Sequence, residues 1–409
     1  MSLILSHLQK NKTSCFFFLI ICCSKEKIFR EYPISVFRKL IREDLLNKKP
    51  GDITMVKNMC NSSYIIGETA YNHEGDIKYL YQMVDDIAEL KLDAVKFHLL
   101  LNLDSFMKKT HPLYKSAPKW MFSEKQWDGV LSYAEKKNLD IVALCDDVDS
   151  IQFILKKHKK VHAIELHATS LNDYYMLQEA AKFNGQIIIG VGGSSIDDIS
   201  YAVDFLKLYG KHDVLLMYGF QSYPTHYTDI NLSKMCAIRD LFCLPVGYAD
   251  HTGFDDPNNE IISVAAAFMG FSILEKHYTP DYGKERIDYH AAVGKKKMKR
   301  IRDLLQIALQ ARGNGQITLS EPEKAYGNVG PMKKAIVARR DIKKGEKLTL
   351  NNLWFKRTPE ESMIQQKQFL RLLGCKAKVD IKKDDVIDFS MIQYTFKSVN
   401  LEHFTNVKR

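Results

Sequence analysis

The hydrophobic positions of the chain alternate between short continuous runs and longer stretches with helical spacing. From about residue 60 onward, eight apolar or β-branched runs recur, each of the length and composition of a buried strand. They lie at 63–68, 93–98, 140–145, 162–167, 186–191, 214–219, 244–249 and 271–276. The pattern predicts eight strands separated by helices.

The stretches between the runs have the periodicity of amphipathic helices. In residues 77–91, Leu80, Met83, Val84, Ile87 and Leu90 fall on one helical face. Eight strand-helix units over about 250 residues are typical of a (β/α)8 barrel, which builds its active site at the carboxyl ends of the strands. An open doubly wound sheet is the alternative, but such a sheet rarely needs eight units.

The pattern changes after residue 312. Residues 313–332 are polar and contain Gly and Pro, as expected of a linker. Residues 333–392 contain short apolar runs and turns without a strand-helix repeat. The predicted fold class is α/β, a TIM barrel over 59–312 followed by a small, mostly β domain over 333–392 and a tail over 393–409.

Residues 1–58 form an N-terminal extension that we expect to be poorly ordered. They hold eleven Lys and Arg against five Asp and Glu, so most of the net charge of +10 resides there. Two lysines precede an apolar run at 15–23, as in a signal peptide, but no small-residue cleavage site follows it. The run is also shorter than the ~20 apolar residues that span a bilayer. No membrane association is expected.

The composition of the chain bears on its binding partners and on its cellular compartment. No basic stripe with interleaved aromatic residues is present, so nucleic acid is not an expected partner. The eight cysteines include no CxxC pair, which favours free thiols in a reducing cytoplasm.

Titratable side chains stand at the ends of nearly all the predicted strands. In chain order they are Glu68; Lys96 and His98; Asp146; Glu165 and His167; Asp250 and His251; and Glu275 and His277. One such residue is usually a solvated polar group, but their recurrence at one rim of a barrel indicates an active site. Side chains alternate along a strand, so Glu275 and His277 share a face while Lys276 points to the other.

The two histidines that follow the last two strands are candidate metal ligands. His251 and His277 would end neighbouring strands of a barrel. Imidazole is the commonest protein ligand for manganese, iron and zinc. We therefore expect them to converge on one divalent ion.

Several motifs together resemble the sialic acid (N-acetylneuraminate) synthase family. They are IIGETAYNHEGD, AVKFH, SYPTHYTDINL, VGYADHTG, ILEKHYTPD and WFKR, and the resemblance covers roughly residues 62–392. It implies a barrel that condenses phosphoenolpyruvate with N-acetylmannosamine or a related 2-acetamido sugar. It also implies an antifreeze-like (SAF) domain that completes the site of the partner subunit in a homodimer with swapped C-terminal domains.

The resemblance also implies roles for particular residues. His251 and His277 match the metal ligands, usually of manganese, and Lys96 matches a lysine that holds phosphoenolpyruvate. Glu68, Glu275 and Asp288 match acids that contact the acceptor sugar or water, and Arg357 matches the arginine of the SAF domain. The candidate catalytic residues are Glu68, Lys96, Glu275 and Asp250, and the candidate substrate-binding residues are Gln221, Tyr223, Asp288, Arg357 and His98.

Some strand ends depart from the family pattern, mostly around the phosphate. Ala163 stands where a second phosphate-binding lysine is expected, and ALCDD and MYGFQ replace the usual third and sixth strand ends. The turn GVGGSS, residues 190–195 at the head of a predicted helix, is an alternative source of phosphate-binding N–H groups.

Three interpretations therefore remain open. The chain is a synthase with a recast phosphate site, or a sugar- or metal-binding protein that has lost the condensation. A third possibility is another carbon–carbon bond-forming reaction in which Glu165 or His167 acts as acid or base.

Overall fold

The structure is a computed structural model that describes residues 63–327 and 332–394. The predicted N-terminal extension, 1–58, lies outside the described residues, as does the tail beyond residue 394. The chain divides after Asn314 into two compact units. No helix within the described ranges is long and apolar enough to cross a membrane.

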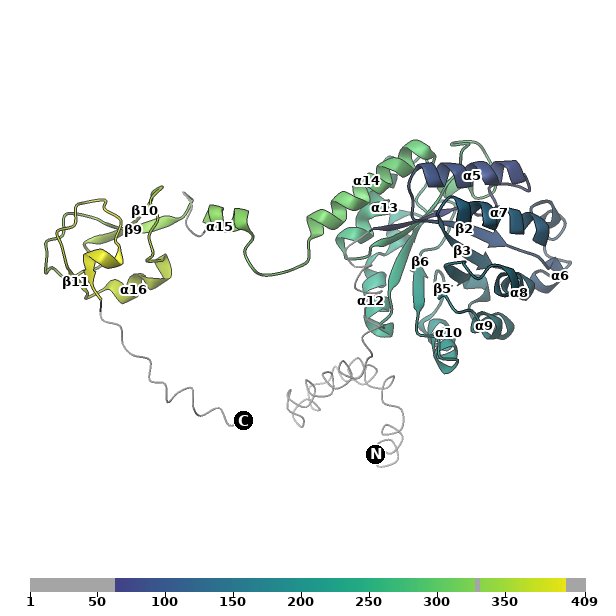
Figure 1. Ribbon diagram of the computed structural model, residues 1–409, viewed down its shortest axis with the longest axis horizontal. Coiled ribbons are helices and arrows are strands. Elements are labelled where there is room, and N and C mark those ends of the chain that lie inside the picture. The colour runs from purple at the N-terminus through teal and green to yellow at the C-terminus, as the bar shows by residue number, and fades with distance from the viewer. Residues whose placement is uncertain (1–62, 328–331, 395–409) are drawn as a thin grey trace, which may run out of the picture. The chain divides into compact units, whose positions relative to one another are not determined.

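Eight parallel strands close the first unit into a barrel, with β1 paired to both β2 and β8 (Figure 1). The strands are β1 (Tyr64–Glu68), β2 (Ala94–Leu99), β3 (Asp140–Cys145), β4 (Ala163–Leu166), β5 (Gln186–Gly190), β6 (Val214–Tyr218), β7 (Val246–Asp250) and β8 (Ile273–His277). The predicted TIM barrel is confirmed, and the strand boundaries differ from the predicted ones by at most two residues at their amino ends.

Helices follow the strands and cover the outside of the barrel (Figure 1). They are α5 (Ile77–Glu89), α6 (Leu103–Phe106), α7 (Glu124–Lys136), α8 (Val148–Lys157), α9 (Tyr174–Ala180), α10 (Ile196–Leu208), α11 (Tyr227–Ile230), α12 (Ser233–Phe242), α13 (Asn259–Phe268) and α14 (Lys295–Arg312). Short 3-10 turns lie at Ala117–Lys119, Ala168–Ser170 and Tyr289–Ala291.

The helix α5 shows how local sequence sets these elements. The Asp76 carboxylate accepts hydrogen bonds from the backbone N–H groups of Lys78 and Tyr79, which caps the first turn. The buried face contains Leu80, Met83, Val84 and Ile87, as the apolar spacing predicts.

The alternation of side chains along the strands produces two separate cores. Outward-facing residues pack with the helices, whereas a small inner core fills the bottom of the barrel. The inner core contains Ile66, Ala94, Val142, Ala163, Ile188, Leu215, Met217, Ala249 and Ile273. On β1, β2, β4, β7 and β8, the next inward-facing residue toward the carboxyl end is titratable. The apolar inner core therefore lies beneath a layer of polar side chains at the carboxyl ends of the strands, the barrel mouth.

The second unit is small and has its own apolar core. Its antiparallel pairs are β9 (Lys334–Ala338) with β10 (Leu353–Arg357), and β11 (Lys376–Ala377) with β12 (Ile392–Gln393). The buried residues include Ile336, Leu353, Ala377 and Ile392. Short helices lie at α15 (Glu321–Gly327), the 3-10 turns Gln366–Gln368 and Phe389–Met391, and α16 (Phe369–Leu372). α15, which has no buried residue, lies within the stretch that the sequence suggested as a linker.

Candidate active site

The centre of the barrel mouth is a lysine held by three glutamates from three different strands. The Nζ atom of Lys96 on β2 lies 2.8 Å from Glu165 Oε1, 2.9 Å from Glu68 Oε2 and 3.0 Å from Glu275 Oε2. All four side chains are almost completely buried. The sequence places them far apart, and closure of the barrel brings them together.

This arrangement gives the carboxyl groups of Glu68 and Glu275 very different pKa values. Burial opposes ionisation of Glu68, but the charges of Lys96 and His98 outweigh it and hold its pKa well below the usual range. Burial raises the pKa of Glu275 to about 8, because Lys96 offsets that effect only in part and the neighbouring glutamates add to it. Near neutral pH the mouth therefore contains a carboxylate at Glu68 and a proton-bearing acid at Glu275.

The ammonium form of Lys96 is strongly favoured. Burial alone would lower its pKa, but Glu165, Glu275 and Glu68 raise it well above the usual value. Lys96 is therefore a fixed cation and a hydrogen-bond donor rather than an amine nucleophile.

His98 extends the polar network toward β3. Its Nε2 lies 3.2 Å from Glu68 Oε1, and its Nδ1 lies 4.0 Å from Asp146 Oδ2. Burial lowers the pKa of His98, but Glu68 and then Asp146 outweigh burial and raise it to about 9. The hydroxyl of Tyr71 donates a 2.6 Å hydrogen bond to the same Asp146 oxygen. His98 is thus a second cation at the mouth.

His251 and His277 lie side by side, with ring centroids 5.0 Å apart. The Nδ1 of His251 is 3.1 Å from the Ala249 carbonyl oxygen, so a proton on Nδ1 would donate to that carbonyl and leave Nε2 as a ligand atom. Burial is the main cause that lowers the pKa of His251 to about 4, and burial likewise holds the pKa of His277 well below its usual range. Both rings are therefore neutral, as metal ligands must be.

The two imidazoles could supply two ligands to a divalent ion, but not a complete coordination shell. No group of three or more His, Cys, Asp or Glu side chains in the described ranges is arranged to hold a metal. An ion held by His251 and His277 would keep further coordination positions for water or substrate, as catalytic sites do.

Asp250 does not join this cluster, although it directly precedes His251. Its carboxylate faces away from the barrel interior and lies 2.7 Å from the Nζ of Lys276, with both side chains fully buried. It also accepts hydrogen bonds from Thr252 and Ser263, and Lys276 holds its pKa at about 2 against the effect of burial. Asp250 is therefore placed to position the strand that presents His251, not to contact a ligand in the mouth.

Three further candidates lie in the loops after β6 and β8. Gln221 donates a 3.3 Å hydrogen bond from Nε2 to Asp288 Oδ1, and the rings of Tyr223 and His290 meet at 5.6 Å. Burial raises the pKa of Asp288. Gln221 and Asp288 form one contact, which joins the loop after β6 to the loop after β8.

The turn at 190–195 offers little for a phosphate. Its helix α10 is capped by Ser195 and Asp198, which bond each other's backbone N–H groups. Asp197 and Asp198 both lie in the first turn, so two carboxylates already occupy the positive end of the helix. The inward residue of β4 beside Lys96 is Glu165, while Ala163 lies deeper in the inner core.

Arg357 is the last residue of β10 in the second unit. It donates a 2.9 Å hydrogen bond from a guanidinium nitrogen to the Met332 sulfur. It therefore belongs to a different unit from the rest of the candidate site.

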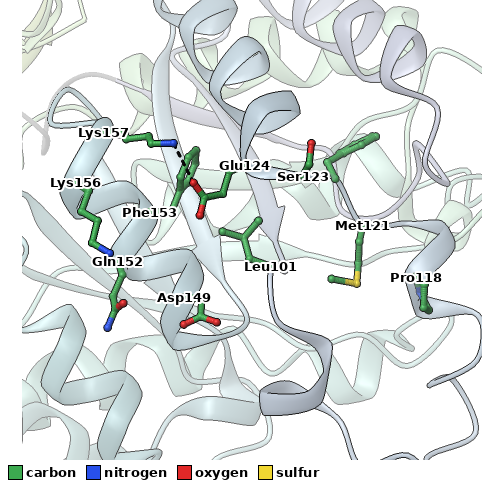
Figure 2. Close-up of a pocket in the computed structure, with 11 residues that line it drawn as sticks. Leu101, Pro118, Met121, Ser123, Glu124, Asp149, Gln152, Phe153, Lys156 and Lys157 are labelled. Atoms are coloured by element: carbon green, nitrogen blue, oxygen red, sulfur yellow. Dashed lines mark hydrogen bonds and ion pairs between the residues drawn. The ribbon is translucent and has the colours of Figure 1, made fainter.

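A groove of about 610 Å³ lies on the flank of the barrel (Figure 2). It runs along α8, against the segment that precedes α7, and its lining includes Leu101, Met121, Phe122 and Phe153. The Glu124–Lys157 ion pair crosses one side of it. None of the mouth residues lines this groove, so it is separate from the candidate active site.

Sequence reasoning gave Glu165 only as an alternative acid or base, and gave Asp146 and Tyr71 no role. The inward position of Glu165 follows from strand alternation once the register of β4 is known. The contact between Tyr71 and Asp146 had no local signal, because it joins the loop after β1 to the loop after β3, 75 residues away.

Comparison with known families and proteins gives a consistent result. The model of the NeuB family matches residues 83–317, and the model of the SAF domain matches residues 333–393. The chain is 31% identical to an uncharacterized protein of Methanocaldococcus jannaschii, over 80% of this chain and 93% of that protein. It is 27% identical to the N,N'-diacetyllegionaminic acid synthase of Campylobacter jejuni, over 79% of this chain and 98% of that enzyme.

A further relative is similar in sequence, and two solved structures are similar in fold. Identity is 24% with the N-acetylneuraminate-9-phosphate synthase of Drosophila melanogaster, over 80% of this chain and 95% of that protein. A spore coat polysaccharide biosynthesis protein E structure from Chromobacterium violaceum superposes with a TM-score of 0.69 at 21% identity, over 81% of this chain and 100% of that one. An N-acetylneuraminic acid synthetase from Leptospira borgpetersenii gives 0.60 at 24% identity, over 65% and 90%.

Proposed function

Because the chain belongs to the NeuB family and carries a SAF domain, we propose that it condenses phosphoenolpyruvate with a 2-acetamido sugar to form a nonulosonic acid. N-acetylmannosamine or a related sugar is the proposed acceptor. The observation that carries the proposal is the convergence of Lys96, Glu68 and Glu275 at the carboxyl ends of the barrel strands. The named relatives that make such acids support the substrate class.

The proposed reaction consumes one water and releases inorganic phosphate. The enol carbon of phosphoenolpyruvate attacks the aldehyde carbon of the open-chain sugar and forms the new carbon–carbon bond. Water then adds to the donor carbon that bears the phosphate ester, and cleavage of the carbon–oxygen bond releases phosphate. The aldehyde oxygen gains one proton and the water loses one as it adds; the second proton of the water leaves with the phosphate when the carbonyl group forms.

Glu275 and Glu68 are suited to these two proton transfers. The pKa of Glu275, about 8, leaves a proton available for the aldehyde oxygen near neutral pH. Glu68 stays ionised because Lys96 and His98 hold its pKa low against burial, so its carboxylate can take the proton of the water. Lys96 and the protonated His98 would bind the anionic groups of the donor.

His251 and His277 would hold a divalent ion, for which manganese is our first choice. When bound, such an ion supplies Lewis-acid polarisation of the aldehyde. The inward-facing, neutral rings of the two histidines suit this role, while Asp250 and Lys276 fix the strands that carry them.

A reaction through a Schiff base on Lys96 is disfavoured. That chemistry needs a neutral amine, whereas the three carboxylates raise the pKa of Lys96 well above its usual value against the effect of burial. A second candidate function is sugar or metal binding without condensation. The observation that favours it is the acidic surrounding of Lys96, which opposes a donor with about three negative charges.

The active assembly is proposed to be a homodimer in which the second unit of one chain completes the site of its partner. Residues 333–392 contain fifteen Lys and Arg against eight Asp and Glu, so this unit is strongly basic. The mouth it would approach contains several carboxylates. Opposite charges of this kind favour encounter and orientation.

The test is an assay of phosphate release by the full-length protein. The protein is incubated with Mn²⁺, phosphoenolpyruvate and a panel of 2-acetamido sugars. Release that depends on one of the sugars, with a nonulosonic acid as the product, supports the proposal. Measurable sugar binding without release from any member of the panel would favour the second candidate.

A further inference from the structure

We propose that Glu165 occupies, in the ligand-free protein, the position on Lys96 that the anionic donor must take, so that donor binding displaces Glu165. The inference rests on the proposed function and deepens it. It makes Glu165 a residue that determines donor affinity and selectivity.

The ammonium group of Lys96 is enclosed by oxygens of three glutamates, of which Glu165 Oε1 accepts a hydrogen bond from it. An ammonium carries three N–H donors. Three carboxylate oxygens surround the Nζ atom at 2.8, 2.9 and 3.0 Å. A phosphate or carboxylate of the donor can therefore reach Lys96 directly only when one of the three glutamates moves away.

Glu68 is the glutamate least able to move. Its Oε1 accepts a 2.9 Å hydrogen bond from the backbone N–H of Ala70 and lies 3.2 Å from Nε2 of His98. Its Oε2 contacts Lys96. Two partners besides Lys96, one of them a backbone N–H, therefore hold this side chain.

Among the described residues, Glu165 is held by Lys96 alone. Its Oε1 accepts the hydrogen bond from Lys96, and its Oε2 is buried without a hydrogen-bond partner among the described residues. The Oε2 atoms of Glu68 and Glu275 are likewise buried without a hydrogen bond, so Glu165 differs from Glu68 in lacking contacts like those with Ala70 and His98.

The charges around Lys96 also favour Glu165 as the side chain that moves. A donor with about three negative charges would meet the acidic side chains around one lysine if nothing moved, and those that are ionised would repel it. Displacement of Glu165 frees one N–H of Lys96 and removes the nearest of these carboxylates. Glu275 faces the half of the mouth that carries His277, where the acceptor is expected to bind.

The consequence is that Glu165 weakens donor binding and selects against anions that cannot displace it. Glu165→Gln keeps the size of the side chain but removes its charge, so the donor should bind more tightly to the variant. We expect the Kd of phosphoenolpyruvate to fall at least about tenfold, which corresponds to about 1.4 kcal/mol. The donor KM should fall by a similar factor, while the acceptor KM stays within about twofold.

The experiment is calorimetric titration of the full-length protein with phosphoenolpyruvate, and separately with inorganic phosphate, without any sugar. Glu165→Ala provides a second variant that removes the carboxylate entirely. Glu124→Gln is the matched control, because it removes one carboxylate on exposed α7 that contacts Lys157 rather than Lys96. Tighter binding in both Glu165 variants and an unchanged control support the inference.

Unchanged or weaker binding by Glu165→Gln, or no binding of either anion by any of the proteins, overturns it. The proposed function is tested by other data. Tighter anion binding without phosphate release from any sugar would leave this inference standing and reject the condensation. Phosphate release by the unaltered protein, together with unchanged anion affinity in the Glu165 variants, would support the condensation and reject this inference.

Discussion

Lys276 Nζ lies 2.7 Å from Asp250 Oδ2, and both side chains are completely buried on the outer face of β7 and β8. The ion pair therefore lies on the face of the strands opposite to the histidines, because His251 directly follows Asp250 and His277 directly follows Lys276. Ser263 of α13 donates a hydrogen bond to the same carboxylate oxygen, which ties the pair to the surrounding helix. The finding assigns Asp250 to support rather than to contact with substrate.

Lys276→Met should strongly destabilise the barrel. The change leaves the Asp250 carboxylate buried without its cation, and loss of one partner of a buried pair typically costs about 3–5 kcal/mol. Urea unfolding measures the difference in the free energy of unfolding. The control Lys160→Met, at a side chain that is 84% exposed, should change stability by less than about 0.5 kcal/mol. A loss below about 1 kcal/mol at Lys276 would contradict the assignment.

His251→Ala and His277→Ala should each abolish tight binding of Mn²⁺ while the barrel stays folded. The two rings lie side by side at the mouth, and each would supply one of only two imidazole ligands. Calorimetric titration with Mn²⁺ should show the affinity for the metal falling at least about 100-fold. Loss of a residue that only hydrogen-bonds to a metal ligand typically lowers the affinity by about 10–100-fold, so loss of the ligand itself should exceed that effect. His226→Ala, on the loop before α11, is the control variant. Metal affinity that is the same in the unaltered protein and both variants would refute the site.

The ion pair of His98 with Glu68 should stabilise the protein in a pH-dependent way. Burial lowers the pKa of His98, but Glu68 outweighs it, so the folded pKa is about 9 against a usual value of 6.5. A raised pKa stabilises the fold fully below the unfolded value, and this contribution is lost as the pH rises through about 9. Relative to His98→Gln, the unaltered protein should gain about 3 kcal/mol at pH 6, since one unit corresponds to ~1.4 kcal/mol.

This gain should disappear by about pH 10. The measurement is urea unfolding of both proteins from pH 6 to pH 10. His111→Gln, which replaces an exposed histidine on the loop before α7, serves as the control. An equal difference between His98→Gln and the unaltered protein at all pH values would show that His98 does not carry the raised pKa.

Arg357 should act on the site of the partner subunit. An Arg357→Ala chain and a His277→Ala chain are each expected to be inactive, because one lacks the SAF-domain cation and the other a metal ligand. Mixing them should restore activity up to about a quarter of the unaltered level, since one site in some mixed dimers receives an intact residue from each chain.

Subunit exchange must be shown independently, by native mass spectrometry of the mixed sample. Lys367→Ala paired with His277→Ala provides the control, in which the Lys367→Ala chain should already be active by itself. Proven exchange without recovery in the Arg357 mixture would place Arg357 in its own chain's site or outside the chemistry.

The sequence by itself determined the architecture and much of the mouth. Eight apolar runs separated by amphipathic stretches were enough to predict the barrel, because burial on both faces and helical spacing are local properties of the chain. Strand alternation also placed Glu275 and His277 on one face and Lys276 on the other, as the structure has them. The short helix α15 had no such apolar signal, since none of its residues is buried.

Only the tertiary structure decided which charges meet. Lys96 and Glu165 are 69 residues apart, and their contact depends on the register of every strand between them and on closure of the barrel. The sequence likewise could not tell that Asp250 would pair with Lys276 behind the histidines, because that choice depends on which face of β7 turns inward. Proton affinities follow from such contacts and from burial, both of which are absent from the chain until distant strands have packed together.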